Sequence, residues 1–315
     1  MVVRRAPYTP ERLSPSASRD HPPSADPADI VKLTSLMART SGSPTVTIGL
    51  IDGPVATQHS DLTQHIREVR ADNGGTCTQA DSKACLHGTF IAGILSAKRS
   101  SLAPAICPSC TLLICPIFSE VTSGPERMPT ATPTQLAAAI VECIDAGARV
   151  INLSLALTQP STKEEQPLEE ALNQATRRNV IVAAAAGNQG TIGSSAITRH
   201  PWVIPVVACD RFGRPMNMSN LGSSIGRRGL RAPGDAITSL GAEGQPLTLG
   251  GTSVAVPFVT GTAALLWSVF PSATAAHIKL AMMQPATSRR TSVVPPLLDA
   301  ASAYQLLSAA LSRRE

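Results

Sequence analysis

Apolar and polar positions alternate along this chain in blocks that predict strands and helices in turn. Short, mostly β-branched apolar runs predict buried strands at residues 45–52, 111–117, 150–155, 180–186 and 203–209. Longer runs typical of helices lie between and after them, at 87–98, 133–146, 166–178, 253–268, 272–284 and 299–311. Because alternating strands and helices need crossover connections, the pattern predicts an α/β fold with a mostly parallel central sheet and helices on both faces.

The start of the chain differs from the rest. Residues 1–27 are rich in Pro, Ser, Arg and Asp, which predicts a flexible Pro/Ser-rich arm followed by one folded domain over 28–315. A helix is expected next, with Ile30, Leu33, Leu36 and Met37 on one face. Since about 44 residues precede the first strand, fewer than the roughly 50 of a small domain, no folded prodomain is expected there.

Composition and charge narrow the class of protein. The chain has 315 residues, 43% hydrophobic and 3% aromatic, so one large core of Ala, Leu, Ile and Val is expected. The net charge is +5, but the arginines are scattered and not grouped with aromatic residues, which argues against nucleic-acid binding. No apolar segment follows the N-terminal arginines, and no run of about 18 apolar residues occurs. The prediction is a cytoplasmic protein with no membrane partner; the oligomeric state stays open.

Four segments carry the residue types that nucleophilic hydrolysis needs. Asp52 ends the predicted strand 45–52, where the carboxyl ends of parallel strands form a ligand crevice. His87 stands at the start of the predicted helix 87–98, and Asn188 follows the predicted strand 180–186. Ser253 lies on the first turn of the predicted helix 253–268, which would fix its hydroxyl group and leave its backbone N–H free for an oxyanion.

Each of these residues also has a purely structural explanation when it is taken alone. Asp52 could cap the Gly-Pro turn that follows it, and His87 could be a satisfied core histidine. Asn188 could occupy a left-handed position in a glycine-rich turn, and Ser253 could belong to an ordinary helix N-cap. A lipase would instead need a Gly-x-Ser-x-Gly elbow, and Ser253 does not lie in one.

Taken together and in this order, the segments resemble the subtilisin-like serine proteases, or subtilases. The resemblance covers about residues 30–310 and implies a three-layer subtilisin-like fold. The motifs that carry it are Asp52-Gly53-Pro54-Val55, His87-Gly88-Thr89, Ser154-Leu155-Ala156, Ala185-Ala186-Gly187-Asn188, Ser219-Asn220-Leu221-Gly222 and Gly251-Thr252-Ser253. The Asp motif and the segment 102–107 are most similar to subtilases that mature cyanobactin-type ribosomal peptides.

The resemblance implies a serine endopeptidase that works through an acyl-enzyme, processing a ribosomal precursor peptide. Asp52 would orient His87, and His87 would take the proton of Ser253. Asn188 and the Ser253 N–H would form the oxyanion hole. An extended peptide or protein substrate would add a strand against Ser154, Leu155 and Ala156. The pocket for the residue before the cut would lie between that strand and Ala185, Ala186 and Gly187, and Ala156 stands where the family usually has Gly.

Two other functions stay open. A peptide macrocyclase or transpeptidase resolves the acyl-enzyme with a substrate amine, and the resemblance implies extra shielding helices for it between the Asp and His motifs. Only 34 residues separate Asp52 from His87, which favours hydrolysis. A non-catalytic pseudoprotease would bind peptides without reacting, and a serine-directed probe distinguishes it. No cofactor is expected for the chemistry and no metal ligands are assigned; a structural calcium ion, common in subtilases, has no Asp-rich loop to identify its site.

Seven cysteines cannot all pair within one chain. A local disulfide, Cys107–Cys110 or Cys77–Cys85, is expected if the protein meets an oxidising compartment. The Cys107-x-x-Cys110 spacing also suits a zinc knuckle or a redox pair, but no second such motif follows. Cys143 and Cys209 lie in apolar runs and are expected to be inert core residues.

Overall fold

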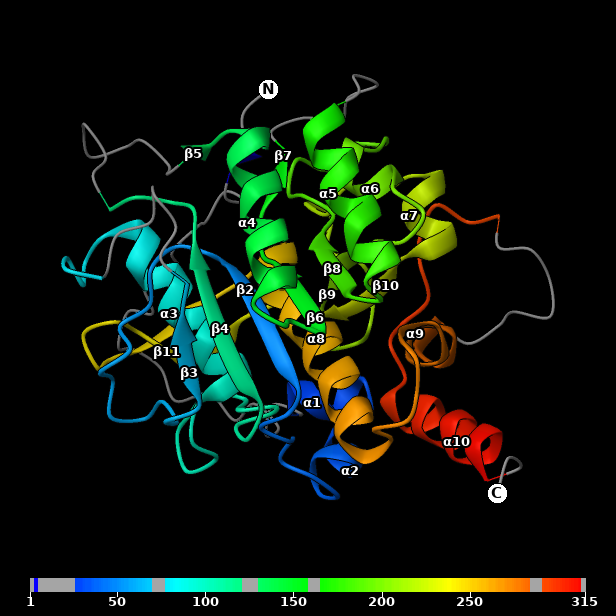
Figure 1. Cartoon of the computed structure of the whole chain (residues 1–315), viewed down its shortest axis with the longest axis horizontal. Helices are drawn as coiled ribbons and strands as arrows, with labels where there is room; N and C mark the ends of the chain where they lie inside the picture. Colours follow the sequence, from blue (N-terminus) through cyan, green and yellow to red (C-terminus); the bar gives the residue numbers. More distant parts are fainter. Residues whose placement is uncertain are drawn as a thin grey trace.

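The computed structural model describes residues 3–4, 26–69, 77–120, 130–157, 165–283 and 291–312, and a seven-stranded sheet lies at its centre (Figure 1). Its strands are in the order β10-β9-β8-β6-β2-β4-β3, and each neighbouring pair is parallel. The strands are β2 (Thr47–Asp52), β3 (Ile66–Glu68), β4 (Thr111–Pro116), β6 (Val150–Leu153), β8 (Ile181–Ala185), β9 (Ile204–Cys209) and β10 (Leu230–Pro233).

Two small antiparallel sheets and a set of helices complete the described elements. The small sheets are β5-β1-β7, made of β1 (Val3–Arg4), β5 (Thr130–Ala131) and β7 (Ala156–Leu157), and the pair β11 (Ile237–Leu240) and β12 (Pro246–Leu249). The helices are α1 (Pro27–Ile30), α2 (Thr34–Met37), α3 (Lys83–Ser96), α4 (Pro133–Asp145), α5 (Gln166–Arg177), α6 (Ala196–Arg199), α7 (Ser223–Arg228), α8 (Thr252–Val269), α9 (Ala275–Met283) and α10 (Ala300–Leu311).

Helices cover both faces of the central sheet, as the sequence predicts. On one face α3 and α8 pack against the strands, and Phe90 and Val256 share a core with Leu50 of β2. On the other face α4 and α5 form a second core, in which Ile140 lies with Ile51 of β2. Because successive side chains of a strand point to opposite faces, β2 supplies both cores and is buried along its whole length.

All eleven elements predicted from residue 45 onward are present, with ends shifted by a few residues. The single helix expected over Ile30 to Met37 is wrong: α1 and α2 are separated at Lys32, whose φ of 52° is left-handed and cannot continue a helix. The pattern also misses β3 and β10 to β12, which are short. Of the expected polar loops 70–85 and 118–132, residues 70–76 and 121–129 lie outside the described residues, and 83–85 are helical.

The sheet topology defines where a site can form. After β2 the chain forms β3 and then β4 on one side of it and returns to β6 on the other side, so β2 lies at a switch point of the sheet. Asp52 ends β2, Ser154 follows β6 and Asn188 follows β8 shortly after its end. These residues therefore share the carboxyl edge of neighbouring strands.

One described helix, α8, is long and apolar enough to span a membrane by length and composition, although no such run was expected. It has 18 residues and a mean hydropathy of 1.4, and 89% of it is buried inside the protein. It packs against α3 and against the strands β6, β8, β9 and β10, which are the contacts of a central core helix.

Candidate active site

Side chains from three separate elements form one hydrogen-bonded chain at this edge. Asp52 is the last residue of β2, His87 lies on α3, and Ser253 is the second residue of α8. The Nδ1 of His87 lies 2.8 Å from Oδ1 of Asp52, and its Nε2 lies 3.2 Å from Oγ of Ser253. Asp52, His87 and Ser253 are 1%, 2% and 4% exposed. A base between a carboxylate and a hydroxyl group is the arrangement that activates a serine.

The close approach of β2 to α3 depends on two glycines. A Cβ added to Gly53 would lie 2.2 Å from the carbonyl oxygen of Ala84, and one added to Gly88 would lie 2.4 Å from that of Pro54. Side chains there would push α3 away from the loop after β2. The sequence prediction that His87 opens the helix is wrong: α3 begins at Lys83, and His87 is its fifth residue.

The hydroxyl group of Ser253 is not used to cap its helix. The N-cap of α8 is Gly251, with a φ of 127° and no side-chain cap hydrogen bond. Pro257 has no N–H and cannot donate to the carbonyl of Ser253, four residues before it. Instead the Oγ of Ser154 donates to that carbonyl at 2.7 Å. Further buried bonds support Ser154, from Asn152 Nδ2 at 2.8 Å and from Thr260 Oγ1 to Asn152 Oδ1 at 2.9 Å.

Asn188 lies against the same helix start with one end of its amide occupied. Its Oδ1 accepts hydrogen bonds from the N–H and the Oγ1 of Thr252, at 3.0 and 2.8 Å. Its Nδ2 is buried without a hydrogen-bond partner. The left-handed residue of this turn is Gly187, with a φ of 102°, so the turn does not require Asn188 for its backbone shape. A buried donor left unpaired is costly, and this one suits a bound oxyanion.

Asn220 holds the loop that carries Asn188. Its Oδ1 accepts from the backbone N–H groups of Gln189 and Thr191, at 3.0 and 3.1 Å, and its Nδ2 donates to Gln189 Oε1 at 2.6 Å. From sequence alone, Asn220 and Asn152 lie in family-like segments but have no predicted role, and Thr260 is not singled out. Neither strand nor helix periodicity marks a buried polar residue whose partner lies far along the chain.

The expected substrate-binding residues fall into two groups around this edge. Ser154 supports Ser253 as described above, and Ala156 begins β7. The side chain of Leu155 is fully buried in the core under α4 and α5, so only its backbone can face a peptide. On the other side Ala185 ends β8, and the following residues Ala186 and Gly187 are buried, with the N–H of Gly187 donating to Thr252 Oγ1 at 3.3 Å.

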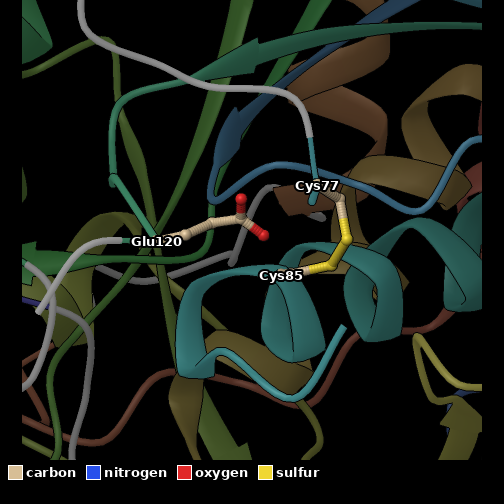
Figure 2. Close-up of side chains that lie close together, drawn as sticks. All are labelled: Cys77, Cys85 and Glu120. Carbon is tan, nitrogen blue, oxygen red and sulfur yellow. A yellow bond between two sulfur atoms is a disulfide. The ribbon is translucent and has the colours of Figure 1, made fainter. Parts of the chain in front are cut away.

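A disulfide joins Cys77 to Cys85 on the first turn of α3, with the carboxylate of Glu120 beside it (Figure 2). One of the two predicted pairings is thus confirmed, while Cys107 and Cys110 are free buried thiols. Burial raises the pKa of Glu120, but hydrogen bonds from Thr78 and neighbouring groups outweigh it and hold that pKa below its ordinary value.

This cluster does not fit a structural metal ion. Cys77, Cys85 and Glu120 bring their donor atoms within 4.8 Å of one another, which in the described part of the chain makes them a candidate metal-binding group. The two sulfur atoms are bonded to each other, so no thiolate remains to bind a metal. A single carboxylate is also far short of the six to eight oxygen ligands that calcium takes.

The predicted core cysteines are buried as expected. Cys143 and Cys209 are both fully enclosed. A hydrogen bond with Cys115 and burial raise the pKa of the Cys143 thiol well above its ordinary value. Burial raises the pKa of Cys209 to about 12. Both thiols therefore stay protonated and unreactive near neutral pH.

Known proteins are similar to this chain in sequence and in fold. A family model described as the subtilase family matches residues 43–302. Subtilisin Savinase from Lederbergia lenta is 30% identical over 244 residues, 77% of this chain and 84% of that protein. A thermostable alkaline protease from Halalkalibacterium halodurans is 32% identical over 202 residues, 64% of this chain and 52% of that protein. The protease domain of PatA, a patellamide maturation protease, has a TM-score of 0.76 at 29% identity, covering 85% of this chain and 97% of that domain.

The fold is that of a subtilisin-like serine protease. The chain belongs to the subtilase family. It spans about half the length of the alkaline protease it matches. Members of this family act on peptide substrates and need no cofactor for the chemistry, because side chains and backbone N–H groups carry out each step.

Proposed function

We propose that this chain is a serine endopeptidase in which Asp52, His87 and Ser253 form the catalytic triad. Asn188 and the backbone N–H of Ser253 form the oxyanion hole. The observation that carries this proposal is the continuous hydrogen-bonded chain from Asp52 through His87 to Ser253. The unpartnered Nδ2 of Asn188 beside the helix that bears Ser253 supports the second part.

The residues divide the reaction between them. His87 Nε2 takes the Ser253 proton as the hydroxyl oxygen attacks the substrate carbonyl, and Asp52 stabilises the resulting imidazolium. The tetrahedral oxyanion accepts hydrogen bonds from Asn188 and the Ser253 N–H. His87 then gives its proton to the leaving amine, which leaves an acyl-enzyme. Water, deprotonated by His87, hydrolyses that ester and restores the free serine.

The proposed substrate is an extended peptide that adds a strand along Ser154, Leu155 and Ala156. Ala185, Ala186 and Gly187 border the pocket for the residue before the cut, and the methyl group of Ala156 narrows an adjoining subsite. PatA is by description a maturation protease, and its likeness to this chain supports a ribosomal precursor peptide as the substrate class.

Hydrolysis is favoured over macrocyclisation by the connection between Asp52 and α3. A macrocyclase would need helices there to shield the acyl-enzyme from water. The described residues of this connection, 53–69 and 77–82, contain no helix. In the described part of this connection, therefore, no helix shields the acyl-enzyme from water.

Two predictions about the surroundings stay open to experiment. We assign no calcium site, although calcium binding is common in the family; melting with and without a chelator tests for one. A cytoplasmic location remains the prediction from sequence, but a disulfide such as Cys77–Cys85 is more typical of an oxidising compartment. Cell fractionation distinguishes a cytoplasmic location from an oxidising compartment.

The decisive test incubates the wild-type protein and Ser253→Ala with a peptide library and identifies the products by mass spectrometry. The proposal predicts linear products from the wild type only, with a preferred residue before the cut. Cyclic products would show that the enzyme catalyses transpeptidation and not hydrolysis. Identical product patterns from both proteins, or none, would refute the assignment of Ser253.

A further inference from the structure

The short strand β1 lies between β5 and β7, and β7 begins at Ala156 of the proposed substrate-binding segment. β1 is the middle strand of the small sheet β5-β1-β7 and is antiparallel to both neighbours. Val3 pairs with Ala131 and Leu157, and Arg4 pairs with Thr130 and Ala156. β5 and β7 lie at the same end of the molecule in Figure 1 and are bridged only through β1 among the described strands.

The strand β7 follows closely after Ser154, the residue that supports Ser253. It begins at Ala156, two residues after Ser154, whose Oγ donates to the carbonyl of Ser253 at 2.7 Å. Ala156 is also the last residue of the segment 154–156 against which the proposed substrate adds a strand. Because β1 is antiparallel to β7, the N-to-C direction of Val3–Arg4 runs toward the Ser154 end. A substrate must have the same polarity, since its chain runs toward the carbonyl that Ser253 attacks.

Because β1 pairs with a strand on each side, it prevents another peptide from binding between β5 and β7. An extended strand between β5 and β7 uses the N–H and C=O groups that either strand would offer to another peptide. Ala131 and Ala156 are both nearly buried, at 4% and 6% exposure, so the two walls already enclose a strand. A second peptide cannot enter until β1 leaves.

We propose that the segment Val3–Arg4 is an intramolecular ligand of the substrate groove and competes with peptide substrates. The proposal rests on the proposed function, because it takes the edge that runs from Ser154 into β7 as the one that binds the substrate. Its consequence is kinetic: an occupant that fills the groove nine-tenths of the time raises the apparent KM about tenfold and leaves kcat unchanged. Only substrates that bind well enough to displace the segment are then cleaved at low concentration.

The test breaks the backbone pairing of β1 in the full chain, purified through a C-terminal tag. Proline lacks the N–H that a central strand needs, so Val3→Pro combined with Arg4→Pro releases the segment. The matched control places the same two changes elsewhere in the arm, as Ser16→Pro with Ser18→Pro. Steady-state cleavage of one fluorogenic peptide, taken from the library products, gives KM and kcat for each protein.

The β1 proline variant is expected to lower KM about threefold to tenfold with kcat unchanged, while the control matches the wild type. An octapeptide of residues 1–8 added in trans should inhibit the β1 variant competitively. Equal KM values for wild type and β1 variant would overturn the proposal, even though peptide cleavage itself would stand. A KM that rises with enzyme concentration would also overturn it, since the segment would then come from a second copy.

A binding measurement keeps this test independent of the chemistry. Fluorescein-labelled octapeptide 1–8 is titrated into Ser253→Ala with and without the β1 prolines, and anisotropy reports the Kd. Binding about threefold to tenfold tighter to the proline form supports the proposal even if no protein cleaves any peptide, the result that would refute the proposed function. Equal Kd values, or no binding to either form, would overturn it.

Discussion

The hydrogen bond from Ser154 to the Ser253 carbonyl predicts that substitutions at Ser154 and Pro257 are energetically coupled. Pro257 denies the Ser253 carbonyl its helical donor, and the Ser154 hydroxyl group replaces that donor at 2.7 Å. Ser154 also accepts from Asn152 Nδ2 at 2.8 Å. Ser154→Ala therefore leaves two buried polar groups unpaired, at about 1–3 kcal/mol each. We expect Ser154→Ala to lower the free energy of unfolding by about 3 kcal/mol.

Pro257→Ala should reduce that cost. Alanine at 257 restores a backbone N–H that can donate to the Ser253 carbonyl in the ordinary helical pattern. Ser154→Ala then strands only the amide of Asn152, and its cost should fall to about 1.5 kcal/mol. The coupling energy between the two positions is therefore expected to be about 1.5 kcal/mol.

Urea unfolding of the four proteins in this double-mutant cycle measures the coupling. All four carry Ser253→Ala, which leaves the backbone carbonyl in place and prevents self-digestion. Ser239→Ala is the matched control, because Ser239 Oγ donates at 2.8 Å to the carbonyl of Phe90 on another helix. Its effect should add to that of Pro257→Ala within about 0.5 kcal/mol. Equal coupling for Ser154 and Ser239 would show that Pro257 does not create the need for Ser154.

Three further predictions concern separate parts of the molecule. Asn188→Ala should lower kcat about 100- to 1,000-fold, the loss measured for such a donor in a subtilisin, with little change in KM; a loss below tenfold would remove Asn188 from the oxyanion hole. Replacing Cys77 and Cys85 by alanine should lower the free energy of unfolding by about 2.6 kcal/mol, because the disulfide closes a loop between residues eight apart, and dithiothreitol should then no longer affect the melting temperature. Burial, and then the charge of Lys279, lowers the pKa of His200 to about 4. The unfolded chain therefore takes up this proton first, so stability present above about pH 6.5 is lost toward pH 4, by about 2 kcal/mol between pH 7 and pH 5. Urea unfolding at these two pH values should show that loss shrinking in His200→Gln, and an unchanged loss would refute the assignment.

The sequence pattern predicts the centre of this fold better than its edges. β2 is buried along its whole length, so an unbroken apolar run marks it clearly. β3 has three residues, all at least partly exposed, and resembles a loop in composition. The break between α1 and α2 depends on the left-handed backbone of Lys32, for which a lysine gives no signal.

The active site divides in the same way. Asp52, His87, Asn188 and Ser253 could be proposed from sequence because each lies in or just after a recognisable strand or helix pattern. The network that holds Ser253 could not, because Thr260 and Asn152 meet across 108 positions of the chain and neither type is unusual where it stands. The choice between the disulfides was equally out of reach, since both spacings permit a bond and only the fold brings Cys77 to Cys85.

If His87 and Asp52 activate Ser253, a fluorophosphonate probe should react quickly with that hydroxyl group. We expect rapid phosphonylation of Ser253 in the wild type, located by peptide mass spectrometry. His87→Ala should react more slowly by about 1,000-fold or more, because the hydroxyl group loses its base. Equal labelling rates in the two proteins, or a wild type that is not labelled at Ser253, would contradict this activation.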